Sequence, residues 1–297
     1  MAAESSQPHL DNLLRLLDLE QLDRDLFLGD PGPGEGRLFG GMVAAQSVAA
    51  AYRTVDEGQS MHSLHAYFLR GGRHGVPIRF AVNRVRDGRT FVTRDVVAYQ
   101  SGEAIFDVSC SFTKPEPGIE HQEPMPDAPP PDGLKPWDWG HEVAGDIPEE
   151  MRRQMGRWRE RNPLEMLSCD PLGEPPEGQT PRRRVWVRVK GTLPQDELYH
   201  AAMIAYASDS GLLGTARHPR RPHIGPPRDR AHMGASASLD HSLWFHHPPR
   251  FDGWLLFTSE SPIAHAARAL IYGAMHRPDG RRILSVVQEG LVRLPRV

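Results

Sequence analysis

The chain has 297 residues, of which 39% are hydrophobic and 25% are charged. This composition excludes disorder of the whole chain, and the length favours two domains. The formal charge of −3, from 35 basic and 38 acidic residues, argues against a dedicated nucleic-acid-binding protein. The two cysteines are far apart and suit a reducing, cytoplasmic compartment. No apolar run approaches the roughly 18 residues that a membrane span needs.

The first half of the sequence predicts a central helix followed by an antiparallel sheet. Leucines at helical spacing predict a short amphipathic helix over residues 8–18. Residues 40–55 predict a helix that is apolar on nearly every side, so it has to be buried on most faces. Strand-like runs then follow, several of them joined by tight-turn sequences, at residues 61–70, 78–85, 90–99 and 104–113.

Proline-rich sequence separates this half from a second one. Residues 115–136 are typical of a linker, a helix is predicted over residues 148–161, and residues 171–181 are again rich in proline and glycine. We therefore expect three parts, which are an N-terminal repeat with a leading helix at residues 1–114, a linker with a helix at 115–181, and a C-terminal repeat at 182–297.

The second half repeats the order of the first. It predicts a strand, then an apolar-rich helix over residues 197–216, then strands at residues 236–246, 254–260, 265–276 and 282–294. Ser63-Leu64 corresponds to Ser238-Leu239, and residues 105–110 align with residues 283–288 without a gap. These correspondences indicate that the chain is a tandem repeat of a unit of about 110 residues. One helix wrapped by an antiparallel sheet, present twice, predicts an α+β double hotdog fold.

Three polar residues interrupt apolar segments and are candidates for chemistry. Asp209 follows an apolar helical run, so it is either a buried functional carboxylate or part of a solvent-facing helix end. Ser238 opens a strand and has the simpler interpretation of a polar residue on a half-buried surface. Gln288 interrupts an apolar strand, where it either has partners for both ends of its amide or lies at an exposed edge.

Several other chemistries lack their motifs. In a regular strand Asp240 and Ser242 share a face with Ser238, whereas His241 points to the other face, so adjacency does not make these residues a triad. The sequence contains no G-x-S-x-G, no H-E-x-x-H, and no G-x-G-x-x-G after Gly40-Gly41. We expect neither a metal nor a cofactor.

Five segments together resemble the type II acyl-CoA thioesterases, that is, bacterial thioesterase II and its peroxisomal relatives. They are RLFGGMVAAQSVAAAY, HSLHAYFLRGG, RDGRTFVTRDVVAYQSGEAIF, SLDHSLWFH and SVVQEGLVR, and the resemblance extends from about Leu13 to Arg293. It implies a double hotdog fold and hydrolysis of fatty acyl-CoA to free fatty acid and CoA, the EC 3.1.2 class. It also implies a site of Asp, Ser or Thr, and Gln, which by motif are Asp209, Ser238 and Gln288.

The hypothesis for the mechanism is a water molecule activated by these three side chains. Amide groups at the start of the first helix, at Gly40 and Gly41, are candidates to polarise the thioester carbonyl. Cys110 aligns with Gln288 and the first helix has no matching Asp, so we expect one catalytic centre per chain.

Two departures from the family pattern leave alternatives open. Met42 stands where relatives often have Gln, and residues 217–233 form a long insertion that puts chain-length preference in doubt. The alternatives are a non-catalytic acyl-CoA-binding protein and an enoyl-CoA hydratase. A homodimer or homotetramer is expected from the resemblance.

Overall fold

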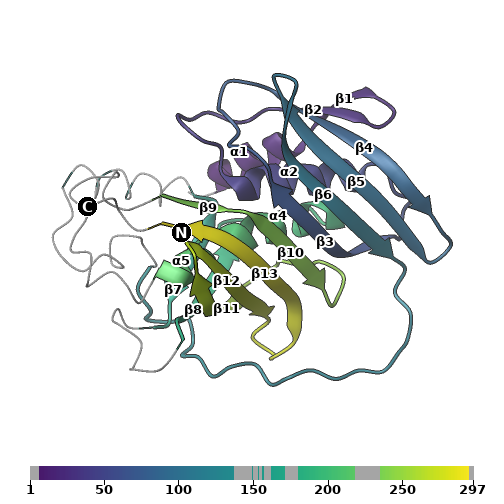
Figure 1. Ribbon diagram of the computed structural model, residues 1–297. Coiled ribbons are helices and arrows are strands. Elements are labelled where there is room, and N and C mark those ends of the chain that lie inside the picture. The colour runs from purple at the N-terminus through teal and green to yellow at the C-terminus, as the bar shows by residue number, and fades with distance from the viewer. Residues whose placement is uncertain are drawn as a thin grey trace.

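In the computed structural model, one long antiparallel sheet wraps around two helices (Figure 1). The structure describes residues 7–136, 149, 153, 156, 162–170, 180–217 and 235–293. The strand order of the described sheet is β1-β2-β4-β5-β6-β3-β10-β13-β12-β11-β8-β7, and β9 also pairs with β13. None of the described helices is long and apolar enough to span a membrane.

The N-terminal half supplies the first helix of the core and the strands that enclose it. Its elements are α1 (Gln7–Leu17), β1 (Glu20–Asp23), β2 (Leu26–Gly29), α2 (Gly40–Tyr52), β3 (Ser60–Phe68), β4 (Ile78–Asp87), β5 (Phe91–Gln100) and β6 (Glu103–Thr113). As its composition predicts, α2 is buried along almost its whole length. The short strands β1 and β2 were not predicted, because four residues carry little periodic signal.

The C-terminal half repeats this arrangement. Its elements are β7 (Leu164–Ser168), β8 (Arg182–Val189), α4 (Glu197–Asp209), α5 (Gly214–Arg217), β9 (Ser236–Ser238), β10 (Asp240–Phe245), β11 (Leu255–His265), β12 (Arg268–His276) and β13 (Arg282–Val292). Strand β7 lies inside the segment expected as a linker, so this half of the sheet begins before residue 182. The helix expected over residues 148–161 lies largely outside the described residues.

The two halves meet in the sheet and in the core, and α1 also contacts the C-terminal half where Thr192 N donates a hydrogen bond to Gln7 Oε1. In the sheet, β3 pairs antiparallel with β10, from Ser63 opposite Trp244 to Tyr67 opposite Asp240. In the core, α2 and α4 pack directly against each other, and each has 13 residues. The predicted α+β double hotdog fold is thereby confirmed, with the two sheets joined edge to edge.

The proline-rich segment after β6 is exposed over residues 114–121 and contacts the C-terminal half from Gln122 onward. Figure 1 shows this teal segment running around the outside of the C-terminal half to reach β7. Trp186 donates a hydrogen bond from Nε1 to Pro129 O at 2.7 Å, and the side chains of Met125, Ala128 and Leu134 pack on a small outer cluster that includes Leu167 and Trp186.

Candidate active site

Asp209 is the last residue of α4 and lies inside the wrapped sheet. Asp196 directly precedes the helix and caps it, since its side chain accepts a hydrogen bond from Leu198 N at 3.0 Å. The prediction of one helix over residues 197–216 was wrong, because the chain becomes extended at Ser210 and Gly211 has a φ of +79°. Asp209 is only 9% exposed, so it is not part of a solvent-facing helix end.

Gln288 comes to Asp209 from β13. Its side chain has no exposed surface, so it lies inside the fold and not at an exposed edge. Nε2 donates a hydrogen bond to Asp209 Oδ1 at 3.0 Å. The other amide atom, Oε1, is buried and has no partner among the described residues. One end of the amide is therefore anchored to the carboxylate while the other end stays available.

Ser238 reaches the same carboxylate from β9. Its Oγ donates to Asp209 Oδ1 over 3.4 Å, which is a long hydrogen bond. Helix α4 and strands β9 and β13 thus bring together the three residues that were predicted from the sequence, Asp209, Ser238 and Gln288. Both contacts converge on Oδ1, and Oδ2 accepts no hydrogen bond within the described part of the chain.

A β-bulge places Ser238 on this side of the sheet. Ser238 pairs with Gly290 and Ser242 pairs with Val287. The segment from β9 to β10 therefore advances four residues while β13 advances three, which leaves one extra residue. The predicted single strand over residues 236–246 was therefore wrong, and so was the face it assigned to Ser238. The extra residue turns Ser238 and His241 toward α4 together, whereas Ser242 points outward.

Asp240 holds the bulge together. Its Oδ1 accepts a hydrogen bond from the backbone N–H of Glu289 at 2.6 Å, which replaces a bond of the interrupted ladder. His241 contacts Ser208 instead, and Ser242 contacts His65 at 3.2 Å. Asp240, His241 and Ser242 thus have separate partners and do not form a relay.

The beginning of α2 faces Asp209 from the other repeat. A Cβ added at Gly40 would lie 3.1 Å from Asp209 Oδ2, and one added at Gly41 would lie 2.9 Å from Tyr206 O. A side chain at Gly41 would meet the backbone of α4, and one at Gly40 would meet the Phe68 ring, whose Cε1 atom would be 2.6 Å from the added Cβ, so glycine fits both positions. Phe39, the residue before the helix, supplies no side-chain cap. The first amide groups of α2 therefore have no capping side chain where the candidate site lies.

Apolar side chains surround this meeting point. The rings of Phe39 and Tyr206 are in edge contact with centroids 4.9 Å apart, and Phe68 lies against Gly40. Burial and the nearby Asp209 raise the pKa of Tyr206, so its hydroxyl stays protonated. Leu213, after the end of α4, lies against Gly290. The carboxylate thus stands in largely apolar surroundings.

Ser208 and His241 are two buried neighbours of the site that no motif in the sequence indicated. Ser208 Oγ and His241 Nε2 are 2.8 Å apart, and neither side chain has any exposed surface. The sequence feature that could have indicated Ser208 is its position directly before Asp209. His241 was not indicated because side chains alternate between the two faces of a regular strand, and without the bulge His241 would point away from Ser238.

The opposite end of the helix pair has different chemistry. Here Tyr52, the last residue of α2, donates its hydroxyl to Glu197 Oε1 at 2.8 Å, and Ser60 Oγ donates to the same oxygen at 2.6 Å. Cys110, which aligns with Gln288, is fully buried, and burial strongly raises the pKa of its thiol. Burial also raises the pKa of Tyr52.

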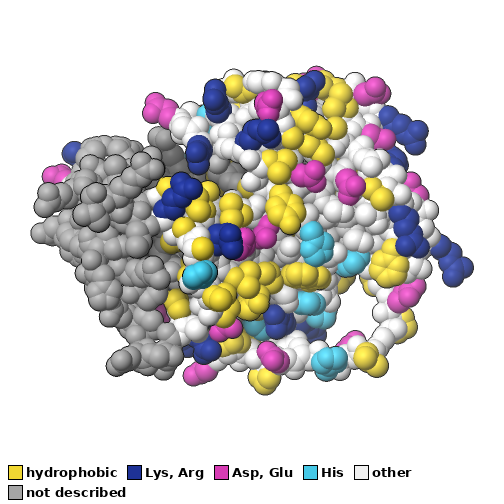
Figure 2. All heavy atoms as spheres, in the orientation of Figure 1, with side chains coloured by type: hydrophobic (Ala, Val, Ile, Leu, Met, Phe, Trp, Pro, Cys, Tyr) yellow, Lys and Arg dark blue, Asp and Glu magenta, His cyan; other side chains and the backbone are white. Residues whose placement is uncertain are grey.

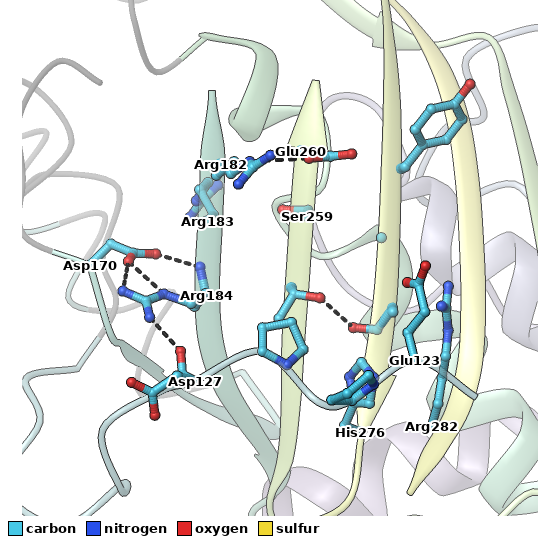
Figure 3. Close-up of a pocket in the computed structure, with 16 residues that line it drawn as sticks. Glu123, Asp127, Asp170, Arg182, Arg183, Arg184, Ser259, Glu260, His276 and Arg282 are labelled. Carbon is cyan, nitrogen blue, oxygen red and sulfur yellow. Dashed lines mark hydrogen bonds and ion pairs between the residues drawn. The ribbon is translucent and has the colours of Figure 1, made fainter. Parts of the chain in front are cut away.

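A hollow of about 550 Å³ lies on the outer face of the C-terminal half, under residues 123–127 (Figure 3). Figure 3 shows two of its arginines paired with carboxylates: Arg182 with Glu260 at 3.1 Å and Arg184 with Asp170 at 2.6 Å. None of the three candidate catalytic residues lines it. This hollow is therefore distinct from the candidate active site.

Within the described ranges, no group of three or more His, Cys, Asp or Glu residues is arranged to hold a metal ion. Met42 is almost fully buried in α2, beside the glycines. The insertion at residues 217–233 lies outside the described residues apart from the backbone of Arg217.

Comparison with known proteins gives a consistent result over nearly the whole chain. The family model for acyl-CoA thioesterase matches residues 160–291, and the model for the acyl-CoA thioesterase N-terminal domain matches residues 29–113. Mouse acyl-coenzyme A thioesterase 8 is 36% identical, with 94% of this chain and 88% of that protein covered. Acyl-CoA thioesterase 2 of Haemophilus influenzae is 34% identical, with coverages of 96% and 98%.

A solved structure agrees with these relatives. The acyl-CoA thioesterase II TesB2 from Mycobacterium marinum superposes with a TM-score of 0.78 at 37% identity, covering 95% of this chain and 98% of that chain. The similarity thus includes both repeats and the connection between them.

Proposed function

The chain belongs to the type II acyl-CoA thioesterase family and hydrolyses acyl-CoA to a free acid and CoA, and we propose that Asp209, Ser238 and Gln288 activate the attacking water. The observation that carries this proposal is the convergence of Ser238 and Gln288 on one oxygen of a buried carboxylate. The apolar surroundings of that carboxylate suit a fatty acyl substrate.

The proton moves through the other carboxylate oxygen. Asp209 Oδ2 has no hydrogen-bond partner among the described residues, so it is available to take a proton from water as the water oxygen attacks the thioester carbon. Gln288 Oε1 and Ser238 Oγ orient the same water. When the C–S bond breaks, the proton returns from Asp209 to the departing CoA thiolate, which leaves the acid and the free thiol.

The negative charge that develops on the carbonyl oxygen needs hydrogen-bond donors. The amide groups of Gly40 and Gly41 at the beginning of α2 are suited to this role, because no side chain caps them and Gly40 lies beside Asp209. One repeat would then supply the base and the other repeat the oxyanion donors. This division gives one catalytic centre per chain.

Replacing the base tests the proposal. We expect Asp209→Asn to keep its fold and to lose about 10²- to 10⁴-fold in kcat, because the amide cannot accept the proton. Release of free thiol from acyl-CoAs of chain length C4 to C20 measures this loss and gives the chain-length profile. Asp11→Asn, an acidic position on α1 outside the site, is the matched control. Full activity in a folded Asp209→Asn variant would contradict the mechanism.

We also propose that the protein acts in the cytoplasm as a homodimer or homotetramer. Apolar side chains gather over the middle of the outer sheet face (Figure 2). Tyr67 on β3, Trp244 on the adjacent β10 and Tyr272 on β12, which follows after β13, are 63%, 37% and 43% exposed. Exposed aromatic residues in such a group favour a second copy of the chain as partner. Light scattering on the purified protein checks the mass, and a monomer at micromolar concentration would contradict the assembly.

A further inference from the structure

A buried hydrogen bond joins the two segments that carry Asp209 and Ser238. It connects Ser208 Oγ to His241 Nε2 over 2.8 Å, between two side chains that have no exposed surface. Ser208 directly precedes Asp209 at the end of α4, and His241 lies on β10, three residues after Ser238 and beyond the bulge. Neither side chain takes part in the water-activation steps proposed above.

The surroundings favour a neutral imidazole. Burial lowers the pKa of His241, against the opposing effect of the carboxylates of Asp209 and Asp240. Ser208 Oγ lies 3.0 Å from Ala205 O and has one proton to donate, either to that carbonyl or to His241. Nδ1 of His241 is buried without a partner in the described part of the chain.

A histidine in this position is costly if packing is its only role. A buried nitrogen without a hydrogen-bond partner destabilises the fold, whereas leucine would fill a similar space without that penalty. The contact with Ser208 is the one hydrogen bond that the His241 side chain makes with described residues. We therefore attribute the presence of a histidine at position 241 to its hydrogen bond with Ser208.

We propose that Ser208 and His241 are positioning residues that hold Asp209 at its working distance from Ser238 and Gln288. The inference rests on the proposed function of Asp209. The direct contact between Ser238 Oγ and Asp209 Oδ1, at 3.4 Å, is too long to fix the geometry by itself. The shorter bond from Ser208 to His241 ties together the same two backbone segments.

The bond from Gln288 holds the Asp209 carboxylate, and the backbone at this helix end needs a restraint of its own. Asp209 ends α4, and terminal helical residues fray unless something outside the helix holds them. A displacement of about 1 Å in a catalytic group costs on the order of 100-fold in rate. Through Ser208, the bond anchors the last turn of α4 to the strand that follows the bulge.

A second buried histidine on the same helix is a matched control. His200, near the beginning of α4, is also unexposed and accepts a hydrogen bond at Nδ1 from Phe251 N, at 3.0 Å. Nine residues of helix, about 13 Å, separate it from Asp209. His200→Leu should therefore reduce stability without changing kcat of the folded enzyme.

The test is thiol release by folded Ser208→Ala, His241→Leu and His241→Gln, with KM and kcat measured separately. We expect the first two to lose about 10- to 100-fold in kcat with KM changed less than about threefold. Combining them should cost little more than the worse single change, because each removes the same bond. His241→Gln should recover most of the rate, since its amide reaches the position of Nε2.

Ser208→Ala keeps the test decisive if His241→Leu does not fold, because alanine is the best helix former and leaves the backbone unchanged. An unchanged kcat in folded Ser208→Ala would overturn the positioning role. So would a loss of rate in His200→Leu equal to that in His241→Leu. Asp209→Asn separates the two ideas: if it is inactive while Ser208→Ala is fully active, only the positioning role fails.

Discussion

The two ends of the α2 and α4 helix pair have matching positions but opposite chemistry. The helices have equal length and pack antiparallel, so Asp209 at the end of α4 lies near Gly40, and Tyr52 at the end of α2 contacts Glu197. At the first end a carboxylate faces a helix beginning without a side-chain cap. At the other end Asp196 caps the helix beginning, and Glu197 is already hydrogen-bonded.

The difference shows what a hotdog site needs beyond the fold. Both ends are enclosed by the same kind of sheet, yet only the first end combines an accepting carboxylate oxygen with uncapped amide groups. At the second end, hydroxyl groups of Tyr52 and Ser60 already satisfy Glu197. We infer that the second end stabilises the helix pair, while the first end performs the reaction.

The largest expected difference in kcat is between substitutions of Gln288 and of Cys110, the aligned strand residues of the two repeats. Gln288→Leu removes a hydrogen bond to a charged group, worth about 1.5–3 kcal/mol, so kcat should fall about 10- to 150-fold. Cys110→Ala at the aligned position should leave kcat unchanged and lower the free energy of unfolding by about 1–2 kcal/mol. Thiol-release assays and urea unfolding measure both effects. Equal rate losses in the two variants would remove the distinction between the ends.

A smaller effect, on stability, is expected from removing the hydrogen bond between Tyr52 and Glu197 at the second end. Tyr52→Phe removes the hydrogen bond to Glu197 and should lower the free energy of unfolding by about 1–2 kcal/mol. Because Tyr52 lies at the far end of α2 from Gly40, kcat should stay within about twofold of wild type. Urea unfolding followed by circular dichroism checks the stability. A large loss of kcat with normal stability would instead indicate a catalytic role for this end.

The smallest expected effect concerns Cys110, whose thiol should not react with an alkylating reagent while the protein is folded. Burial raises the pKa of the Cys110 thiol and, with Asp170 nearby, that of Cys169 to about 11, so little thiolate is present at pH 8. Iodoacetamide should therefore not modify Cys110 in the folded protein and should modify it once urea has unfolded the chain. Mass spectrometry of the treated protein reports this. Rapid alkylation of folded protein would mean that the second end is open to solvent.

Sequence patterns were sufficient for the repeated architecture and for the identity of the three candidate residues. The apolar run of α2 predicted a buried helix, and the family motifs selected Asp209, Ser238 and Gln288, which the structure brings into contact. Helix ends were harder to predict, because Ser210 and Gly211 end α4 while the apolar composition continues into α5.

What sequence periodicity could not supply was the bulge at Leu239. A single extra residue reverses the face of every side chain on one side of it, so strand parity separated Ser238 from His241 when they in fact face the same helix. The Ser208 contact to His241 was missed for the same reason. Its partners are 33 residues apart, and only the register with β13 brings them together.

The pairing of β3 with β10 has a consequence for how the enzyme folds. These strands are separated by more than half of the chain, so the seam between the repeats forms only after a long loop has closed, which slows folding. The proposed base and oxyanion donors come from opposite sides of that seam. Activity should thus appear in refolding only at the last, slowest step, and neither repeat expressed alone should possess it.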